Sequence, residues 1–278
     1  MEPQVTPPSG AGPPGDPERL GRAEYKGGTK LRRLRRMWRT IPSAPRCKMC
    51  NSPFGAPGGP LMRLIGKGRW AGNSDYCSGC FKDLYKHRYG AEITCTLLFA
   101  DIRGSTQLAE ATSPAEFRAL LDRFYRTATE LLIGHDAIVD KFVGDEVVAI
   151  FIPALAGANH AGQAIDAGLA LLRSTGHETG SPWAPIGIGI NSGVAFVGAV
   201  GTADHVEFTA LGDTVNVTSR LASIGGPGEI LVSEASLRIA DFDQHHSTVP
   251  FERRQLHLKG KSEATDVTVL TVASIPSK

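Results

Sequence analysis

The chain has 278 residues, 41% of them hydrophobic, which is enough for one large domain and a small module. Its net charge of +2 excludes a protein that binds polyanions over its whole surface. No apolar run approaches the roughly 20 residues of a membrane span. The N-terminus lacks the apolar segment of a secretory signal. We therefore expect a cytoplasmic protein whose five cysteines stay reduced.

Residues 1–46 are expected to form a disordered tail followed by a basic helix. Pro and Gly dominate the first part, and the ten Lys and Arg that follow are opposed by two Glu. Leu31, Leu34 and Trp38 repeat at helical spacing, and Pro42 ends the pattern. We expect the helix to pack on its own protein with its basic side in solvent. Contact of this basic arm with a membrane surface or nucleic acid is the alternative.

Two C-x2-C pairs, separated by 26 residues, predict a metal-binding module at residues 47–80. Each pair can chelate one ion through both sulfurs, and two pairs complete a tetrahedral zinc site. The alternatives are an iron–sulfur cluster and a pair of disulfides, of which a reducing compartment disfavours the second. Because so short a segment buries little core, the metal is expected to supply most of its folding energy. The predicted ligands are Cys47, Cys50, Cys77 and Cys80.

Residues 81–90 are predicted to be a linker helix, and residues 91–274 a large domain of alternating strands and helices. Ser113 before Pro114 is typical of a helix start, and Gly144 of a tight turn between two strands. The order β-α-β-β-α-β, with further strands appended, predicts a ferredoxin-like sandwich of the mixed α/β (α+β) class, with its helices on one face of a single sheet.

Two carboxylates fall at strand ends of this domain. Asp101 follows the apolar run LLFA, and Asp145 follows Gly144 at the tip of the predicted hairpin. The β-α-β-β order makes that strand and that hairpin neighbours, so the two carboxylates should meet. Carboxylates held close repel unless a divalent cation lies between them, and Mg²⁺ prefers oxygen ligands of this kind.

Two further groups of residues suit phosphate. The turn at Gly104, Ser105 and Thr106 leads into a helix whose free N–H groups can bind a triphosphate. Asn216 and Arg220 lie four residues apart on one side of a later predicted helix, where an amide and a guanidinium can bind an anion together.

With these residues in place, the chain resembles the class III nucleotidyl cyclases, the adenylate and guanylate cyclase family. The resemblance extends over roughly residues 91–274 and implies that this segment is a cyclase catalytic domain. The matching strings occur in the family's order: LLFADIRGST, DKFVGDEVVAIF, GIGINSGVAFVGAVG, FTALGDTVNVTSRL and HLKGK.

The resemblance implies two Mg²⁺ or Mn²⁺ ions per active site, held by Asp101, Asp145 and the carbonyl of Ile102. It also implies a homodimer with shared active sites, in which the metal-binding residues of one chain face the remaining site residues of its partner.

Five further roles follow from the resemblance alone. Lys141 and Thr209 resemble the two residues that recognise the purine base. Asn216 and Arg220 resemble the pair that positions the ribose and stabilises the transition state. Lys259 resembles the lysine that binds the triphosphate.

The base-recognising pair favours ATP as the substrate. Lys141 can donate to adenine N1 and the Thr209 hydroxyl can accept from the 6-amino group, whereas guanine requires an acceptor where Lys141 stands. A threonine at this position is typical of one adenylate cyclase subgroup. We therefore predict an adenylate cyclase that forms cyclic AMP and pyrophosphate.

Four alternatives remain. They are a guanylate cyclase, a catalytically weak nucleotide-binding regulator of the same fold, a diguanylate cyclase, and a nucleic-acid-binding protein that acts through the metal module and the basic arm. A diguanylate cyclase shares the Gly-Asp-Glu tip but not the TVNVTSR helix, and the regulator should have lost at least one of the site residues.

Overall fold

The computed structural model describes residues 31–41, 43–70, 76–80, 82, 90–201, 206–246, 248–258 and 264–272. Three predictions therefore lie outside the described residues: the disordered N-terminal tail, most of the linker helix at residues 81–90, and the placement of Lys259. No helix among the described residues has both the length and the apolar character needed to cross a membrane.

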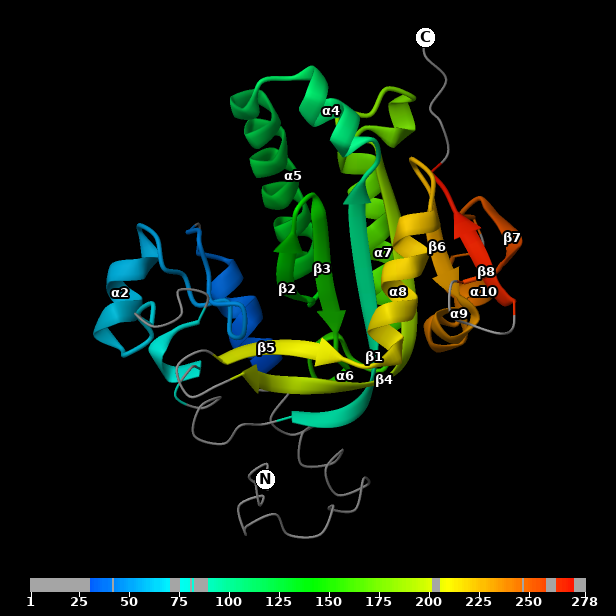
Figure 1. Cartoon of the computed structure of the whole chain (residues 1–278). Helices are drawn as coiled ribbons and strands as arrows, with labels where there is room; N and C mark the ends of the chain where they lie inside the picture. Colours follow the sequence, from blue (N-terminus) through cyan, green and yellow to red (C-terminus); the bar gives the residue numbers. More distant parts are fainter. Residues whose placement is uncertain are drawn as a thin grey trace, which may run out of the picture.

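One eight-stranded sheet forms the body of the molecule (Figure 1). Its strands follow the order β2-β3-β1-β4-β6-β8-β7, with β5 paired to β4. The first four strands have the ferredoxin-like order, and β1 is antiparallel to both of its neighbours, which confirms the predicted fold class. The strand bounds are β1 Gly90–Ile102, β2 Ile138–Val143, β3 Glu146–Phe151, β4 Ile186–Gly201, β5 Val206–Leu211, β6 Ile230–Ser233, β7 Phe251–Leu256 and β8 Thr265–Leu270.

The helices begin where local sequence signals favour a start. Ser113 caps the longest helix, α5 (Pro114–Gly134), through a reciprocal capping box with Glu116, as the sequence predicts. Asn159 caps α7 (His160–Ser174) with its side-chain oxygen. The other helices are α2 Gly58–Leu64, α4 Ser105–Ala111, α6 Pro153–Ala156, η1 His177–Thr179, α8 Asp213–Ile224, α9 Glu234–Ala240 and α10 Phe242–His245.

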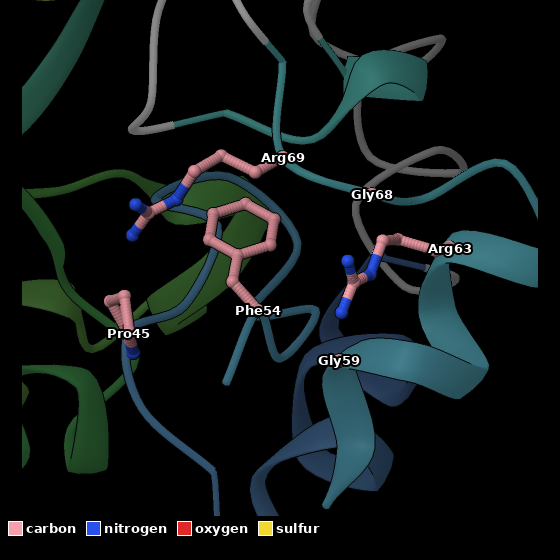
Figure 2. Close-up of a pocket in the computed structure, with 6 residues that line it drawn as sticks. All are labelled: Pro45, Phe54, Gly59, Arg63, Gly68 and Arg69. Atoms are coloured by element: carbon pink, nitrogen blue, oxygen red, sulfur yellow. The ribbon is translucent and has the colours of Figure 1, made fainter. Parts of the chain in front are cut away.

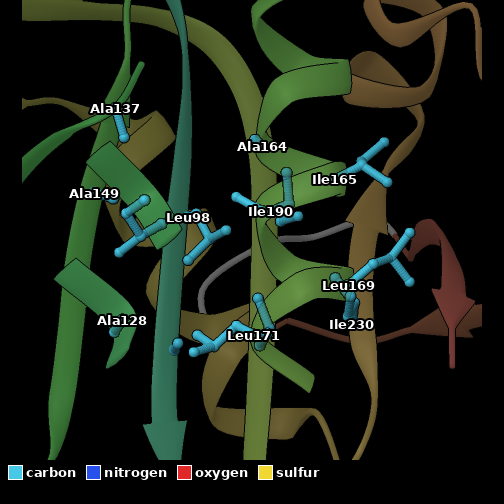
Figure 3. Packing of buried hydrophobic residues seen from close by; sticks show 14 of the residues in the cluster. Leu98, Ala128, Ala137, Ala149, Ala164, Ile165, Leu169, Leu171, Ile190 and Ile230 are labelled. Atoms are coloured by element: carbon cyan, nitrogen blue, oxygen red, sulfur yellow. The ribbon is translucent and has the colours of Figure 1, made fainter. Parts of the chain in front are cut away.

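The main core lies between the sheet and the helices α5 and α7. Leu98 of β1 and Ile190 of β4 point into it, together with Ala128 of α5 and Ala164 of α7 (Figure 3). Strand residues alternate between the two faces of a sheet, so Leu97 and Phe99 belong to a second buried cluster on the opposite face. Asp101 has the same parity as these two and therefore lies on the second face.

Helix α8 covers this second face, so the expectation that all helices share one face is wrong for α8. Glycines of β4 allow the close approach: a Cβ on Gly189 would lie 2.3 Å from the backbone nitrogen of Ala222. A Cβ on Gly193 would likewise come too close to the side chain of Thr214 in α8. Because β4 carries isoleucine on one face and glycine on the other, α7 and α8 pack on opposite sides of the same strand.

The N-terminal helix, residues 31–39, packs on the large domain as predicted, but part of its basic side is buried. Arg35 is fully buried and donates to the carbonyls of Met49 (2.8 Å) and Ala137. Arg39 donates to carbonyls at the end of α5. Burial lowers the pKa of Arg35 to about 10, still far above neutral pH, so it remains a cation. The expectation of a solvent-facing basic side is therefore wrong for Arg35, which instead satisfies backbone carbonyls.

The cysteine module lies beside β2 and the beginning of β5 (Figure 1). Tyr76 is buried in the same apolar cluster as β1 and β5, and its hydroxyl accepts a hydrogen bond from the N–H of Phe208 (3.0 Å). Lys48, between the first two cysteines, donates to the carbonyl of Asp140 in β2 (2.7 Å). The module is thus bonded to the two strands that carry Lys141 and Thr209.

Candidate active site

Strand pairing brings the two predicted carboxylates together. Asp101 at the end of β1 pairs with Glu146 at the start of β3, next to Asp145. Gly144 has φ of 61°, a left-handed conformation that favours glycine, and this allows the tight turn before Asp145. Asp145 is close enough to Asp101 to raise the pKa of its carboxyl group. The predicted meeting of strand end and hairpin tip is thus present within one chain.

These carboxylates destabilise one another's charged forms. The pKa of Asp101 is raised to about 6, first by burial and then by Asp145, against the opposing charge of Arg103. The pKa of Glu146 is raised to about 7, first by burial and then by Asp101 and Asp145. A hard divalent cation stabilises the charged forms of carboxylates that repel one another, and it prefers oxygen ligands. The residues present therefore fit such an ion.

Two neighbours of this pair were not predicted from the sequence. Glu146 adds a third carboxylate at the hairpin tip. Arg103 forms an ion pair with Asp101 (3.0 Å) and donates to the carbonyls of Ala222 and Ser223 at the end of α8. Arg103 therefore ties the carboxylate end of β1 to the helix that carries Asn216 and Arg220. The only sequence signal was its position directly after Asp101 and Ile102, which are predicted to bind metal.

The predicted phosphate turn follows the carboxylate directly. Ile102 is buried in the main core, and Gly104 precedes α4 with φ of 72°, in the left-handed region that favours glycine. Ser105 and Thr106 form the first turn of α4, where Ser105 is partly exposed and Thr106 exposed. These residues follow Asp101 within five positions of the chain, and their exposure leaves them accessible to a ligand.

The two predicted base-recognising residues meet at a third residue. The hydroxyl of Thr209 donates to Asp140 Oδ2 (2.7 Å), and Lys141 Nζ lies 3.6 Å from the same oxygen. Thr209 and Asp140 are buried, whereas the Lys141 side chain is 42% exposed. Burial raises the pKa of Asp140, while its hydrogen bond from Thr209 and the charge of Lys141 counteract this. The structure brings Lys141 and Thr209 together, and Asp140 was not predicted.

Asn216 and Arg220 lie on α8 as predicted, Asn216 exposed and Arg220 partly exposed. Within the described part of the chain, no hydrogen bond or ion pair occupies the Arg220 guanidinium or joins either residue to Asp101 or Asp145. The segment that leads to Lys259 reaches the same helix, because Leu258 is buried against Leu221 and Val217 of α8. Lys259 itself lies outside the described residues.

The four predicted metal-binding cysteines form one cluster. Their sulfur atoms all lie within 4.8 Å of one another, and Cys50 Sγ is 3.7 Å from Cys77 Sγ. The N–H of Cys77 donates to Cys47 Sγ, and the N–H of Cys80 to Cys77 Sγ. Hydrogen bonds from the other three thiols lower the pKa of Cys77, which favours a thiolate there. The cluster could therefore hold a metal ion.

A separate cavity of about 340 Å³ lies within the same module (Figure 2). Phe54 and Arg69 line it, with the Arg69 guanidinium 5.3 Å from the centre of the Phe54 ring, and Arg63 and Pro45 complete its walls. Among the described residues, neither a clustered cysteine nor a predicted active-site residue lines this cavity, so we treat it apart from the candidate site.

Comparisons with known proteins agree with the fold. The family model described as "Adenylate and Guanylate cyclase catalytic domain" matches residues 87–271. The chain is 36% identical over 132 residues to "Adenylate cyclase 1" of Rhizobium meliloti (strain 1021), covering 45% of this chain and 20% of that protein. It is 30% identical over 179 residues to "Adenylate cyclase" of Anabaena cylindrica, covering 62% of this chain and 36% of that protein. The chain thus spans well under two thirds of these relatives.

Solved structures of both cyclase types are similar to the chain. The adenylyl cyclase CyaB from P. aeruginosa superposes with a TM-score of 0.57 and 27% identity, covering 68% of this chain and 97% of that one. The guanylyl cyclase Cya2 superposes with a TM-score of 0.58 and 25% identity, again covering 68% and 97%. The matched family segment, the strand order and the paired carboxylates lead to one conclusion: the chain belongs to the adenylate and guanylate cyclase catalytic domain family.

Proposed function

We propose that the chain is an adenylate cyclase that converts ATP to cyclic AMP and pyrophosphate. The observation that carries the proposal is the meeting of Asp101 and Asp145, whose mutual repulsion suits divalent cations bound with a triphosphate. Mg²⁺ or Mn²⁺ held by these carboxylates and the Ile102 carbonyl would lower the pKa of the ribose 3′-hydroxyl and neutralise the triphosphate.

The remaining site residues act on the substrate itself. The ribose 3′-oxygen attacks the α-phosphorus in line, and pyrophosphate leaves. Arg220 and Lys259 offset the negative charge that develops on the transferred and leaving groups, and Asn216 holds the ribose. The turn at Gly104, Ser105 and Thr106 offers N–H and hydroxyl donors to the phosphates.

We assign adenine as the base because Lys141 can donate a hydrogen bond to adenine N1 and the Thr209 hydroxyl can accept one from the 6-amino group. The direct test is to identify the cyclic product formed by the purified chain from ATP and from GTP, with Mg²⁺ and with Mn²⁺. Cyclic AMP as the main product supports the proposal. Cyclic GMP as the main product, which the similarity to Cya2 makes the second candidate, would reassign the substrate to GTP. Binding of nucleotide without turnover would make the chain a regulator.

Replacing both base-recognising residues, Lys141→Glu with Thr209→Cys, should weaken ATP use and raise GTP use. The glutamate supplies the acceptor that guanine N1–H requires, so we expect the ratio of kcat/KM for ATP to that for GTP to fall by about tenfold or more. Arg118→Glu on the exposed side of α5 reverses a charge without touching the site and should leave the ratio unchanged. An unchanged ratio in the double variant would show that this pair does not recognise the base.

We further propose that the chain acts as a homodimer with shared active sites. In support, apolar side chains are exposed beside both halves of the site: Phe142 and Val143 next to the carboxylate turn, and Val194 and Leu211 on the β4–β5 hairpin. Exposed apolar side chains at a functional surface are typical of a protein interface.

We also propose a single zinc ion for the cysteine cluster. A tetrahedral site with Zn–S bonds of about 2.3 Å places its sulfurs about 3.8 Å apart, and the Cys50–Cys77 separation of 3.7 Å supports this. An iron–sulfur cluster puts several atoms between its ligands and needs a wider arrangement. The burial of Arg35 and the backbone contacts of Arg39 support a structural or regulatory role for the module over nucleic-acid binding.

Cys77→Ser should lose about one metal ion per chain and destabilise residues 47–80, because a hydroxyl does not replace the thiolate ligand. Elemental analysis of the purified protein measures the metal, and limited proteolysis measures the module. Cys95→Ala is the matched control, since Cys95 is buried in β1 outside the cluster and should keep the full metal content. Undiminished metal in Cys77→Ser would contradict the assignment.

A further inference from the structure

The strand that carries Lys141 contains an irregularity at Asp140. The pairing of β2 with β3 shifts between Val139 and Lys141, so Asp140 is an extra residue of β2 with no partner in the β3 register. Such bulges redirect side chains and recur beside active sites. The freed carbonyl of Asp140 accepts a hydrogen bond from Lys48 of the cysteine module (2.7 Å). The backbone of Asp140 is therefore fixed from outside the sheet.

The side chain of Asp140 is fixed as well. It is buried, and its Oδ2 atom accepts the hydroxyl proton of Thr209 at 2.7 Å. The same oxygen lies 3.6 Å from Lys141 Nζ, which leaves the partly exposed ammonium close to Thr209. One carboxylate oxygen thus positions both residues.

This contact decides what Thr209 can offer to a base. A threonine hydroxyl has one proton and two lone pairs. Because the proton is donated to Asp140, only lone pairs remain, and Thr209 acts as an acceptor. The 6-amino group of adenine is a donor and satisfies it, whereas the 6-oxygen of a guanine or hypoxanthine base is an acceptor and is repelled. A buried acceptor without a donor is costly, so the wrong base is rejected.

We propose that Asp140 is a positioning residue that sets base specificity, by holding the Thr209 hydroxyl as an acceptor and Lys141 as its neighbouring donor. The inference rests on the proposed function, because it specifies how the same site selects its nucleotide. Asp140 does not touch the substrate in this scheme; it acts through Thr209 and Lys141.

The test compares three nucleotides that differ at one position of the base: ATP with a 6-amino group, purine riboside triphosphate with hydrogen, and ITP with oxygen. Asp140→Ala removes the acceptor, so the Thr209 proton is free to donate to the 6-oxygen of ITP. We expect the ratio of kcat/KM for ATP to that for ITP to fall by about tenfold or more. The advantage of ATP over purine riboside triphosphate should fall as well.

Three variants separate positioning from general structural support. Asp140→Asn keeps an oxygen that can accept from Thr209 and should retain most of the discrimination. Asp140→Leu, an apolar side chain of similar shape, should behave like Asp140→Ala if the alanine variant does not fold. Asp136→Asn changes another buried carboxylate at the module boundary and preserves its left-handed backbone (φ of 63°), so its ATP-to-ITP ratio should be unchanged.

A folded Asp140→Ala or Asp140→Leu variant that keeps the wild-type ATP-to-ITP ratio, even with lower total activity, would overturn the inference. This failure is distinct from failure of the proposed function. If the unmodified chain forms no cyclic nucleotide, the function is wrong. If it forms cyclic AMP but does not discriminate ATP from ITP, the specificity assigned to Asp140 is wrong.

Discussion

Asp145→Ala should abolish cyclic nucleotide formation and leave the fold intact. The substitution removes one of the two carboxylates proposed to hold the divalent cations, and we expect activity to fall by roughly a thousandfold or more, since bound metal contributes several kcal/mol of transition-state stabilisation. The hairpin should survive because Gly144 still makes the turn, and the Tyr125 hydroxyl still donates to the Gly144 carbonyl. Removing a like charge should also leave thermal stability equal or higher, because Asp145 raises the pKa of Asp101.

The measurement is product formation from ATP with Mg²⁺ and with Mn²⁺, together with circular dichroism and the midpoint of thermal unfolding. Asp122→Ala serves as the control, because it removes an exposed carboxylate of α5 that pairs with Arg118. We expect near-normal activity from this control. Full activity in a well-folded Asp145→Ala protein would refute the assignment of the metal site.

Mixing two inactive variants, Asp101→Ala and Arg220→Ala, should restore activity if the active sites are shared between chains. Each variant alone damages both sites of its homodimer. In a heterodimer, both lesions fall in one site and the other site is intact. Random exchange makes about half of the dimers heterodimers with one working site of two, so roughly a quarter of wild-type activity is expected.

A second mixture provides the matched control. Asp101→Ala and Asp145→Ala both damage the metal-binding half, so every site of their heterodimer carries one lesion and the mixture should stay inactive. Exchange can be verified with affinity tags of two kinds. If the Asp101→Ala and Arg220→Ala mixture remains as inactive as its components despite verified exchange, each site lies within one chain.

Much of the fold follows from local sequence signals. The capping box at Ser113 and Glu116 fixes the start of α5, and the left-handed Gly144 fixes the hairpin. Once the strand order is known, β1 and the β2–β3 hairpin are neighbours, so the end of β1 lies near the hairpin tip, and the pairing register sets Asp101 opposite Glu146 and beside Asp145. The meeting of the two carboxylates could therefore be predicted from the sequence without any side-chain geometry.

The features that escaped prediction depend on pairing between distant segments. Helix α8 covers the face of the sheet on which β4 carries glycines. A glycine in a strand sequence does not by itself indicate that a helix packs against it. Asp140 looked like an ordinary strand residue because a bulge is a property of two strands and not of one. The burial of Arg35 could not be predicted because its acceptors belong to the module and to the segment before β2.

The bond between Arg35 and the Ala137 carbonyl also has a consequence in time. The two residues are 102 positions apart, so a ribosome that adds about 5 to 20 residues per second separates their synthesis by roughly 5 to 20 s. The module's four cysteines are all made in the first half of that interval, before β2 exists. Until that segment is made, the Arg35 guanidinium has the Met49 carbonyl of the module as an acceptor but lacks the Ala137 carbonyl, and the side of the module that will meet β2 is uncovered. The order of synthesis therefore favours formation of the cysteine cluster first and packing of the module against β2 afterwards.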